Sequence, residues 1–254
     1  MLELVTIPCL SDNYAFLLHD AKTGKTALID TPDPLPIEDE LETRGWTLSE
    51  IWLTHHHWDH IDGVADLVAS TGARVVGAEV DQHRLPPLDQ AVTAGQSFGF
   101  SGHDVLVSDV SGHTIGHIAY YVPDAKAAFT GDSLMAMGCG RLFEGRPEQM
   151  WDSLQRLSKL PPDTQICSGH EYTGGNASFA ITIEPDNQAL RARRERIEAA
   201  RAQGLPTVPS LLSEELETNP FLRAHLPSVK ASLHMETATD AEVFAEIRAR
   251  KDNF

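Results

Sequence analysis

The sequence predicts an α/β protein, in which short strands occupy the first part of the chain and helices the last part. Two observations support this fold class. Apolar runs bounded by turn residues recur through the first 170 residues, as strands do. After Glu171 the chain becomes rich in Ala, Arg and Glu, as solvated helices are. We therefore expect one domain over residues 1–170 and a helical domain over residues 171–254.

Each expected strand is a short apolar run that ends near a Gly, Pro, Asn, Asp or Ser signal. These strands are Leu2–Ile7, Ala15–Leu18, Thr26–Ile29, Ile51–Leu53, Arg74–Val76, Val105–Val107, Ile118–Val122, Ala127–Phe129 and Gln165–Cys167. The expected helices have amphipathic spacing, a capping box or a stop at Gly or Pro. They are Val64–Ala69, Pro147–Leu160, Asn187–Ala202, Leu211–Leu216 and a last helix that begins after Thr239.

Charge and composition exclude several classes of partner. The 254 residues have a formal net charge of -17, which repels nucleic acid and anionic membranes. The chain contains no membrane-spanning apolar run, and its first residues do not resemble a signal peptide. Its 3 cysteines are too few for a disulfide framework. We expect a cytoplasmic monomer that binds a small molecule.

The segment His55-x-His57-x-Asp59-His60 places four metal-binding side chains directly after the strand that ends near Thr54. Strand alternation puts His55 and His57 on one side and His56 on the other, where we expect it to support the site or face solvent. Asp59 and His60 follow the turn and could face a second ion. Imidazole and carboxylate ligands suit zinc, iron or manganese.

Three further candidate ligands also follow apolar runs, and a glycine precedes each of them. They are His113, Asp132 and His170. Glycine allows a sharp turn or a close approach of the backbone to a metal. His117 lies four residues beyond His113, and we expect it either to support the site or to pack at the start of a strand.

In this order, the motifs resemble the metallo-β-lactamase superfamily. The resemblance implies a four-layer αββα sandwich, a C-terminal helical domain and two divalent metal ions, with zinc expected and iron or manganese as alternatives. It also implies the ligands of each ion. One ion would be held by His55, His57 and His113, the other by Asp59, His60 and His170, and Asp132 would bridge them.

More specific segments are similar to the glyoxalase II family, the hydroxyacylglutathione hydrolases. They include Gly138–Gly145, Gly169–Thr173, Pro206–Ser210 and Asn219–Arg223. The implied reaction is hydrolysis of S-D-lactoylglutathione to D-lactate and glutathione by a hydroxide held between two metals, the second step of methylglyoxal detoxification. The resemblance makes Asp59 and Asp132 the catalytic residues.

The resemblance also implies the residues that contact the glutathione thioester, namely Arg141, Phe143, Tyr172, Arg248 and Lys251. A substrate with carboxylates needs a local basic patch on a chain of charge -17. Arg248 and Lys251 share one face of the last helix and could supply it, and Arg250 should point elsewhere. The alternative is a solvated basic helix end that complements the helix dipole.

Two of these positions depart from the commoner family pattern. Many members have Lys where this chain has Arg141, and Tyr where it has Phe143. Arg keeps the charge but changes the donor geometry, and Phe removes a hydroxyl donor. The alternative for Phe143 is a packed aromatic ring. Cys139 lies in the same Gly-rich segment, and we expect a structural role for it.

Other functions stay open at this point. The superfamily fold supports several reactions, so a lactonase, a β-lactamase or a persulfide dioxygenase are alternatives. No cysteine occupies a ligand position, which argues against the β-lactamases that use one. A non-catalytic metal-binding module is the alternative from a different class.

Overall fold

The computed structural model describes residues 1–254, and its backbone contacts divide the chain into two compact units. The first unit comprises residues 1–109 and 116–131, and the second comprises residues 110–115 and 132–254. The boundary that the sequence suggests near residue 170 stays a prediction. Each unit is described by itself below.

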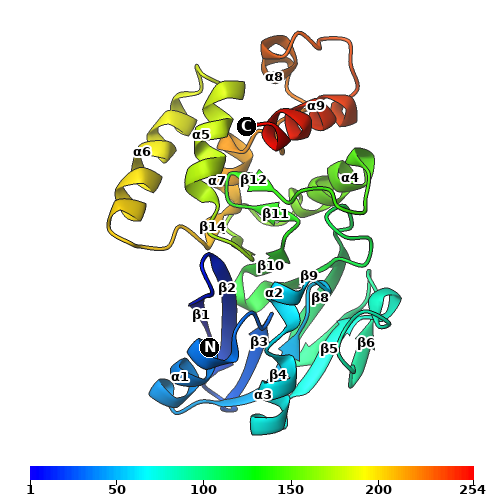
Figure 1. Cartoon of the computed structure of the whole chain (residues 1–254), viewed down its shortest axis with the longest axis vertical. Coiled ribbons are helices and arrows are strands. Elements are labelled where there is room, and N and C mark those ends of the chain that lie inside the picture. The colour runs from blue at the N-terminus through cyan, green and yellow to red at the C-terminus, as the bar shows by residue number, and fades with distance from the viewer. The chain divides into compact units, whose positions relative to one another are not determined.

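The first unit contains a six-stranded sheet with antiparallel and parallel halves (Figure 1). Its strands, in spatial order, are β1 (Leu2–Cys9), β2 (Asn13–Asp20), β3 (Lys25–Ile29), β4 (Thr47–Trp52), β5 (Arg74–Ala78) and β6 (Gln90–Val92). The pairs from β1 to β3 are antiparallel, and those from β3 to β6 are parallel. Parallel neighbours need crossover connections, and α1 (Pro34–Arg44) and α3 (Val64–Thr71) lie in two of them.

Four antiparallel strands of the same unit face this sheet. They are β7 (Ser97–Phe100), β8 (His103–Asp109), β9 (Ile118–Val122) and β10 (Ala127–Gly131). Trp52 is fully buried, and the centroid of its ring lies 5.3 Å from those of Phe98 and Phe100 and 5.6 Å from that of Tyr120. These aromatic contacts join β4 to β7 and β9. The two sheets therefore bury their facing sides against each other.

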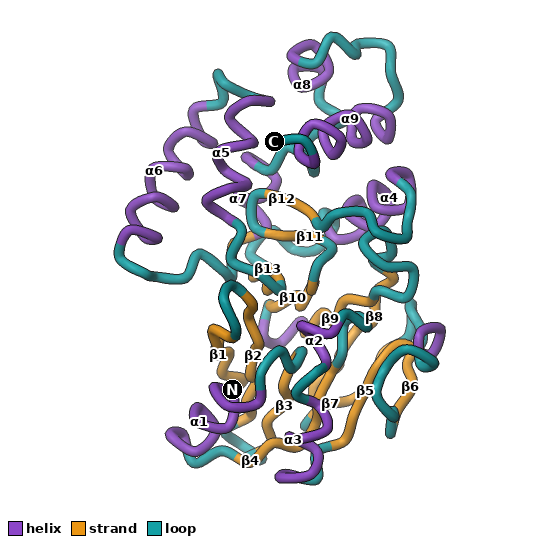
Figure 2. Tube along the Cα trace, in the orientation of Figure 1, coloured by secondary structure: helices purple, strands orange, loops and turns teal.

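The second unit is mainly helical (Figure 2). Its helices are α4 (Pro147–Leu157), α5 (Thr173–Ile183), α6 (Gln188–Ala202), α7 (Leu212–Thr218), α8 (Pro227–Ser232) and α9 (Asp240–Asp252). Its short strands are β11 (Leu134–Met135), β12 (Gly138–Cys139), β13 (Gln165–Ser168) and β14 (Ser210–Leu211). Helix α5 packs on α6, and α4 packs on α9. Buried residues of α5, α6 and the β11–β12 turn form one hydrophobic cluster, Met137, Ala177, Ala180, Leu190 and Ile197.

A buried polar network holds the β11–β12 hairpin within this unit. The fully buried carboxylate of Glu215 accepts hydrogen bonds from Arg193, from the amide of Met137 and from Asn219. Asn219 also donates to the carbonyl oxygens of Met135 and Gly138. A buried charge is tolerated when its hydrogen bonds are complete, so the network fixes the hairpin on α6 and α7.

The predicted strands all occur, with ends that differ by a few residues. Strand β4 begins at Thr47 and ends at Trp52, one residue short of the predicted end. Helix α4 ends at Leu157, before the predicted Leu160, and α7 covers Leu212–Thr218. The sequence patterns missed α1, α5, α8, the short helix α2 (Trp58–Ile61) and several short strands. Two short 3-10 turns, η1 (Glu79–Asp81) and η2 (Pro123–Ala125), complete the elements.

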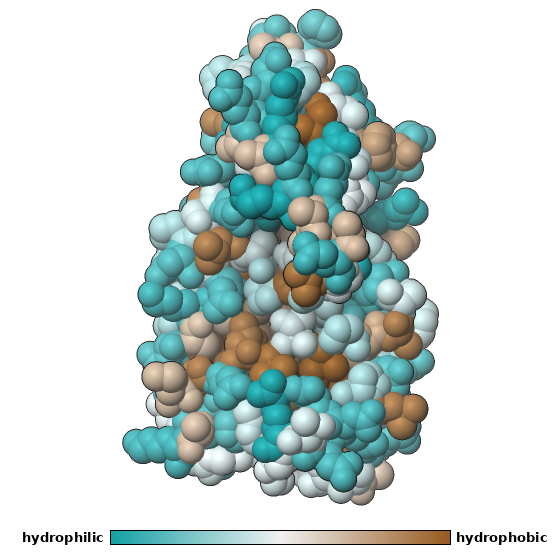
Figure 3. Space-filling model, turned by 90° about the vertical axis from the view of Figure 1, so that its left-hand side faces the viewer, coloured by the Kyte–Doolittle hydropathy of each residue, from teal (hydrophilic) through white to brown (hydrophobic).

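The surface is predominantly polar where it is visible. In Figure 3, hydrophilic side chains cover most of the face shown, and apolar groups lie between them. Among the helices, none combines the length and the apolar character that crossing a membrane requires.

Candidate metal and substrate site

The first unit brings its predicted ligands together at the end of β4. The ring centroids of His55 and His60 lie 4.2 Å apart, and His55 Nε2 lies 3.1 Å from His57 Nδ1. The backbone of this segment is held from the facing strand β9. The amide of Ile118 donates to the carbonyl oxygen of Thr54, and the hydroxyl of Tyr120 donates to that of Leu53.

Hydrogen bonds to Asp30 and Thr54 fix which nitrogens can bind a metal. The hydroxyl of Thr54 donates to Asp30 Oδ2, so it accepts from His55 Nδ1, 3.0 Å away. The proton on Nδ1 leaves a lone pair on Nε2, the atom that faces His57. In the same way, His60 Nδ1 lies 2.8 Å from Asp30 Oδ2, which leaves Nε2 as its ligand atom. Such outer partners orient the ligands of metal sites.

Asp30 is a functional residue that the sequence patterns missed. It is buried, and its backbone adopts a φ of 57°, a left-handed conformation that is strained for a residue with a side chain. Its carboxylate also accepts the amide of Thr54. Potential ligand atoms of Asp30, His55 and His60 all lie within 4.8 Å of one another. The signal that could have found it is its place directly after β3, beside β4 in a parallel pair.

Asn13 is a second residue whose role was not predicted. Its side-chain amide donates to the carbonyl oxygen of Asp59 at 3.0 Å and to the Oδ2 atom of Asp59 at 3.1 Å. Asp59 Oδ2 in turn lies 3.8 Å from His60 Nε2. Asn13 therefore orients the Asp59 carboxylate from β2, across 46 positions of the chain.

His56 and His117 both contact groups in or beside the segment, which is one of the alternatives that the sequence left open for each. His56 Nδ1 lies 3.0 Å from Asp81, a buried carboxylate that also accepts from Arg84. The ring of His117 stacks on that of His55, with centroids 4.5 Å apart and planes inclined by 11°. Gly131 makes this stack possible, because a Cβ at that position would lie 2.5 Å from Thr54 Oγ1 and 2.9 Å from the His117 ring.

The second unit brings its three predicted ligands together around Asp132. The Oδ2 atom of Asp132 lies 3.5 Å from His113 Nε2 and 3.3 Å from His170 Nε2, and all three residues are buried. His113 Nδ1 lies 2.7 Å from the carbonyl oxygen of Arg141, which fixes its proton there and leaves Nε2 facing Asp132. Gly140 permits this packing, since a Cβ there would lie 1.9 Å from the carbonyl oxygen of Asp132.

Two exposed aromatic rings pack on these imidazoles. Tyr172 stacks on His170, with ring centroids 4.7 Å apart, and Phe143 contacts His113 edge to face at 5.2 Å. The rings remain 44% and 63% exposed, respectively. Phe143 therefore matches the alternative of a packed aromatic ring only in part. Its ring contacts His113, but most of its surface remains exposed to solvent.

The predicted basic residues of α9 lie in the same unit. Arg248 Nη1 donates to the carbonyl oxygen of Cys139, and its guanidinium lies over the ring of Phe221. Lys251 Nζ lies 5.4 Å from the centroid of the Phe179 ring. Burial lowers the pKa of Lys251, and the charge of Arg248 lowers it further. Arg250 is exposed and pairs instead with Glu246 at 2.8 Å.

Cys139 has the environment of a structural cysteine. It is buried, and its burial raises the pKa of the thiol to about 11, although Arg248 nearby opposes this shift. The thiolate is therefore a minor species at neutral pH.

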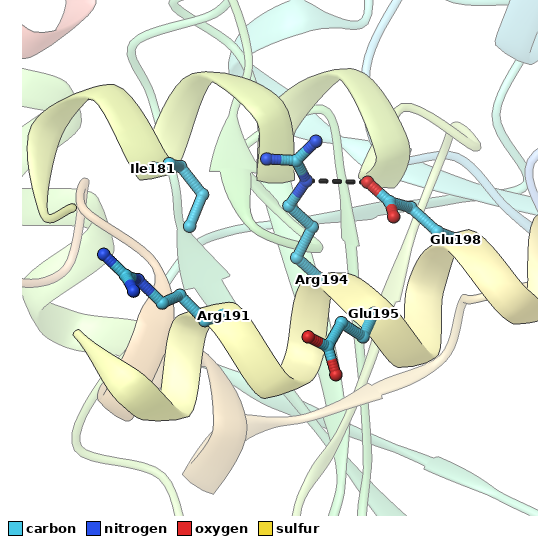
Figure 4. Close-up of a pocket in the computed structure, with 5 residues that line it drawn as sticks. All are labelled: Ile181, Arg191, Arg194, Glu195 and Glu198. Atoms are coloured by element: carbon cyan, nitrogen blue, oxygen red, sulfur yellow. Dashed lines mark hydrogen bonds and ion pairs between the residues drawn. The ribbon is translucent and has the colours of Figure 1, made fainter. Parts of the chain in front are cut away.

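A separate hollow lies between α5 and α6. It is lined by Ile181, Arg191, Arg194, Glu195 and Glu198 (Figure 4). Arg194 pairs with Glu198 at 2.7 Å, and the Arg191 Nε donates to the carbonyl oxygen of Pro185. The hollow contains none of the predicted site residues, and its basic side chains have partners within the chain.

The seven predicted ligands thus form two sets, four residues in the first unit and three in the second. Imidazole and carboxylate groups bind divalent metal ions. Hydrogen bonds from neighbouring residues already orient several of these groups, as they do in metal sites. The donor types in both sets suit the divalent metal ions that the motif implies.

Comparison with known proteins decides the family. Residues 11–170 match the metallo-beta-lactamase superfamily, and residues 171–254 match the hydroxyacylglutathione hydrolase C-terminus. A hydroxyacylglutathione hydrolase of Ruegeria pomeroyi is 62% identical over 253 residues, which cover 100% of this chain and 99% of that protein. The chain belongs to the hydroxyacylglutathione hydrolase family.

Solved structures confirm the fold of this hydroxyacylglutathione hydrolase family member. The BLEG-1 B3 metallo-beta-lactamase superposes with a TM-score of 0.68 at 20% identity, over 87% of this chain and 99% of its own. TTHA1623, solved in a di-iron-bound form, gives a TM-score of 0.55 at 30% identity, over 66% of this chain and 91% of its own. The predicted family, fold class and enzyme class, a metal-dependent hydrolase, are confirmed.

Proposed function

We propose that this chain hydrolyses S-D-lactoylglutathione and related 2-hydroxyacylglutathione thioesters to a hydroxy acid and glutathione. The observation that carries the proposal is the 62% identity to a hydroxyacylglutathione hydrolase over the full length of both chains. The complete set of predicted ligands supports it, since a non-catalytic module would not need them all.

The proposed cofactor is a pair of divalent metal ions, with the ligands that the resemblance of the motifs implies. One ion would bind His55, His57 and His113, the other Asp59, His60 and His170, with Asp132 shared. The orientation of the ligand nitrogens of His55, His60 and His113 supports metal binding by these residues, and the 30% identical TTHA1623 was solved in a di-iron-bound form. Mixed imidazole and carboxylate ligands suit zinc, which we expect, as well as iron or manganese.

Bound there, the metal ions would supply an activated water and a positive charge for the thioester oxygen. The chain's own carboxylates would complete the chemistry. Asp132 would lower the repulsion between two cations. Asp59, oriented by Asn13, would hold the attacking water and accept its proton at a carboxylate oxygen. The thiolate of glutathione is a good leaving group, so the chain needs no strong general acid.

The basic and aromatic residues of the second unit would bind the glutathione part. Arg141, Arg248 and Lys251 would attract its carboxylates against the overall charge of -17. Phe143 and Tyr172 present exposed rings beside the ligands His113 and His170, where they could pack along the tripeptide.

Three further properties belong to the proposal. We expect a metal domain followed in the sequence by a helical substrate domain. The expected boundary is near residue 170, where one family match ends and the other begins. We expect a monomer, which sedimentation would test. A cytoplasmic location is supported by its three buried cysteines, all of them free thiols.

The test is hydrolysis by the purified full-length protein. Steady-state rates would be measured on lactoylglutathione beside a lactone, a β-lactam and a persulfide. We expect the thioester to have the highest kcat/KM by orders of magnitude. A lactone or a persulfide turned over faster than the thioester would overturn the proposed substrate while leaving the family intact.

A further inference from the structure

Asp252 lies between two of the basic residues proposed to bind the substrate. Its Oδ1 atom is 2.9 Å from Nη2 of Arg248, one turn earlier on α9, and 3.4 Å from Nε of Arg141, in the segment after β12. One carboxylate oxygen therefore contacts two guanidinium groups that are far apart in the sequence.

The stability of α9 does not explain an acidic residue at this position. Asp252 is the last residue of the helix, where the negative end of the helix dipole disfavours a carboxylate. Arg250 and Lys251 in the same turn have the favourable sign. The contacts with Arg141 and Arg248 offset the unfavourable position.

Apart from their contacts with Asp252, the two arginines differ in burial and in hydrogen bonding. The Arg248 side chain is 8% exposed, donates from Nη1 to the carbonyl oxygen of Cys139, and has a buried Nε without a hydrogen-bond partner. The Arg141 side chain is 59% exposed. A long exposed side chain loses rotamer entropy when it binds a ligand, so a contact that already orders Arg141 lowers the entropy lost on binding.

We infer that Asp252 is a positioning residue for substrate binding. It orients the guanidinium groups of Arg141 and Arg248 toward a carboxylate of the glutathione part, and it lowers the repulsion between their charges. It acts through these arginines and not by touching the substrate. Because each guanidinium has five N–H donors, donors remain for a substrate carboxylate. This inference rests on the proposed function.

The principal experiment compares Asp252→Asn with the wild type in steady-state hydrolysis of lactoylglutathione. We expect KM to rise about fivefold, the size of one partly exposed charge-assisted hydrogen bond, with kcat within about twofold. Asp252→Glu keeps the charge and should recover part of the loss. Glu246→Gln is the matched control, because Glu246 forms a comparable ion pair with Arg250 on the same helix, and its KM should not change.

A double variant tests whether Asp252 acts through the arginines. In an Arg141→Ala background, Asp252→Asn should raise KM by a clearly smaller factor than in the wild type. An equal factor in both backgrounds would overturn the inference. An unchanged or lower KM in Asp252→Asn would do the same, as would a fall in kcat with no change in KM.

Direct binding separates this inference from the proposed function. Calorimetry with glutathione itself needs no turnover. If the wild type fails to hydrolyse the thioester, the proposed function fails. Weaker glutathione binding by Asp252→Asn than by Glu246→Gln would still support the positioning role, and equal binding would overturn it.

Discussion

The ring of Tyr172 stacks on the imidazole of His170, with centroids 4.7 Å apart and planes inclined by only 6°. His170 Nε2 lies 3.3 Å from the Asp132 carboxylate, so the aromatic ring fixes the plane of an imidazole that points at that group. The exposed half of Tyr172 remains available to a ligand. One residue thus joins the proposed substrate surface to the proposed metal ligands.

Replacing Tyr172 should separate these two roles. Tyr172→Phe keeps the stacked ring and should retain full metal content with a small rise in KM. Tyr172→Ala removes the ring, so we expect KM to rise roughly tenfold and metal to be lost faster to a chelator. Metal analysis and steady-state kinetics on both variants would check this. If the alanine variant kept its metal as firmly as the phenylalanine variant, Tyr172 would have no part in orienting His170.

Phe143 offers a gain-of-binding test. Its side chain is 63% exposed beside His113, so Phe143→Tyr adds a hydroxyl donor to a ring that presents most of its surface to solvent. We expect Phe143→Tyr to lower KM by about three- to tenfold, the worth of one hydrogen bond, with kcat unchanged. Steady-state kinetics would check it. An unaltered KM would mean that the missing hydroxyl has no counterpart on the substrate.

The ligand residues could be predicted from the sequence because they lie in short local motifs. Asp30, Asn13 and Asp252 could not, because each contacts at least one residue that is far away in the sequence, which for Asp252 is Arg141. Asp30 and Thr54, for example, meet only because β3 and β4 pair in parallel.

Physical reasons also explain why some helices could not be predicted from the sequence. Helix α1 begins with Pro34 and Pro36, which are typical of loops as well as of a first helical turn, and Asp33 caps it by accepting the amide of Leu35. Helix α5 contains Gly174 and Gly175, which have low helix propensity. It forms because Ala177 and Ala180 pack against Leu190 of α6.

Cys139 should be dispensable for the chemistry. Its pKa is raised to about 11 by burial, so it is a thiol at neutral pH. Cys139→Ala keeps the backbone carbonyl that accepts from Arg248, and we expect kcat within about twofold of the wild type. Alkylation of the native protein at pH 8 should be slow and leave activity intact. A hundredfold loss of kcat in a folded Cys139→Ala variant would contradict this assignment.

The lowered pKa of Lys251 leads to a prediction of how KM changes at alkaline pH. Burial disfavours the charged ammonium and lowers its pKa from the ordinary 10.5. As pH rises through this lowered pKa, the positive charge disappears and the attraction for a substrate carboxylate is lost. KM should therefore begin to rise at a lower pH than an ordinary lysine would cause. Lys251→Arg, which stays charged, should remove the rise. A rise that persists in the arginine variant would assign it to another group.

The most direct measurement is metal content together with thioester hydrolysis, on the same preparations of wild type and Asp132→Ala. The wild type should contain two metal ions per chain, lose hydrolysis of lactoylglutathione on chelation and regain it when metal is restored. Asp132→Ala should lose metal and at least about a thousandfold in kcat/KM together. A metal-free wild type that hydrolyses the thioester at an undiminished rate would contradict the account.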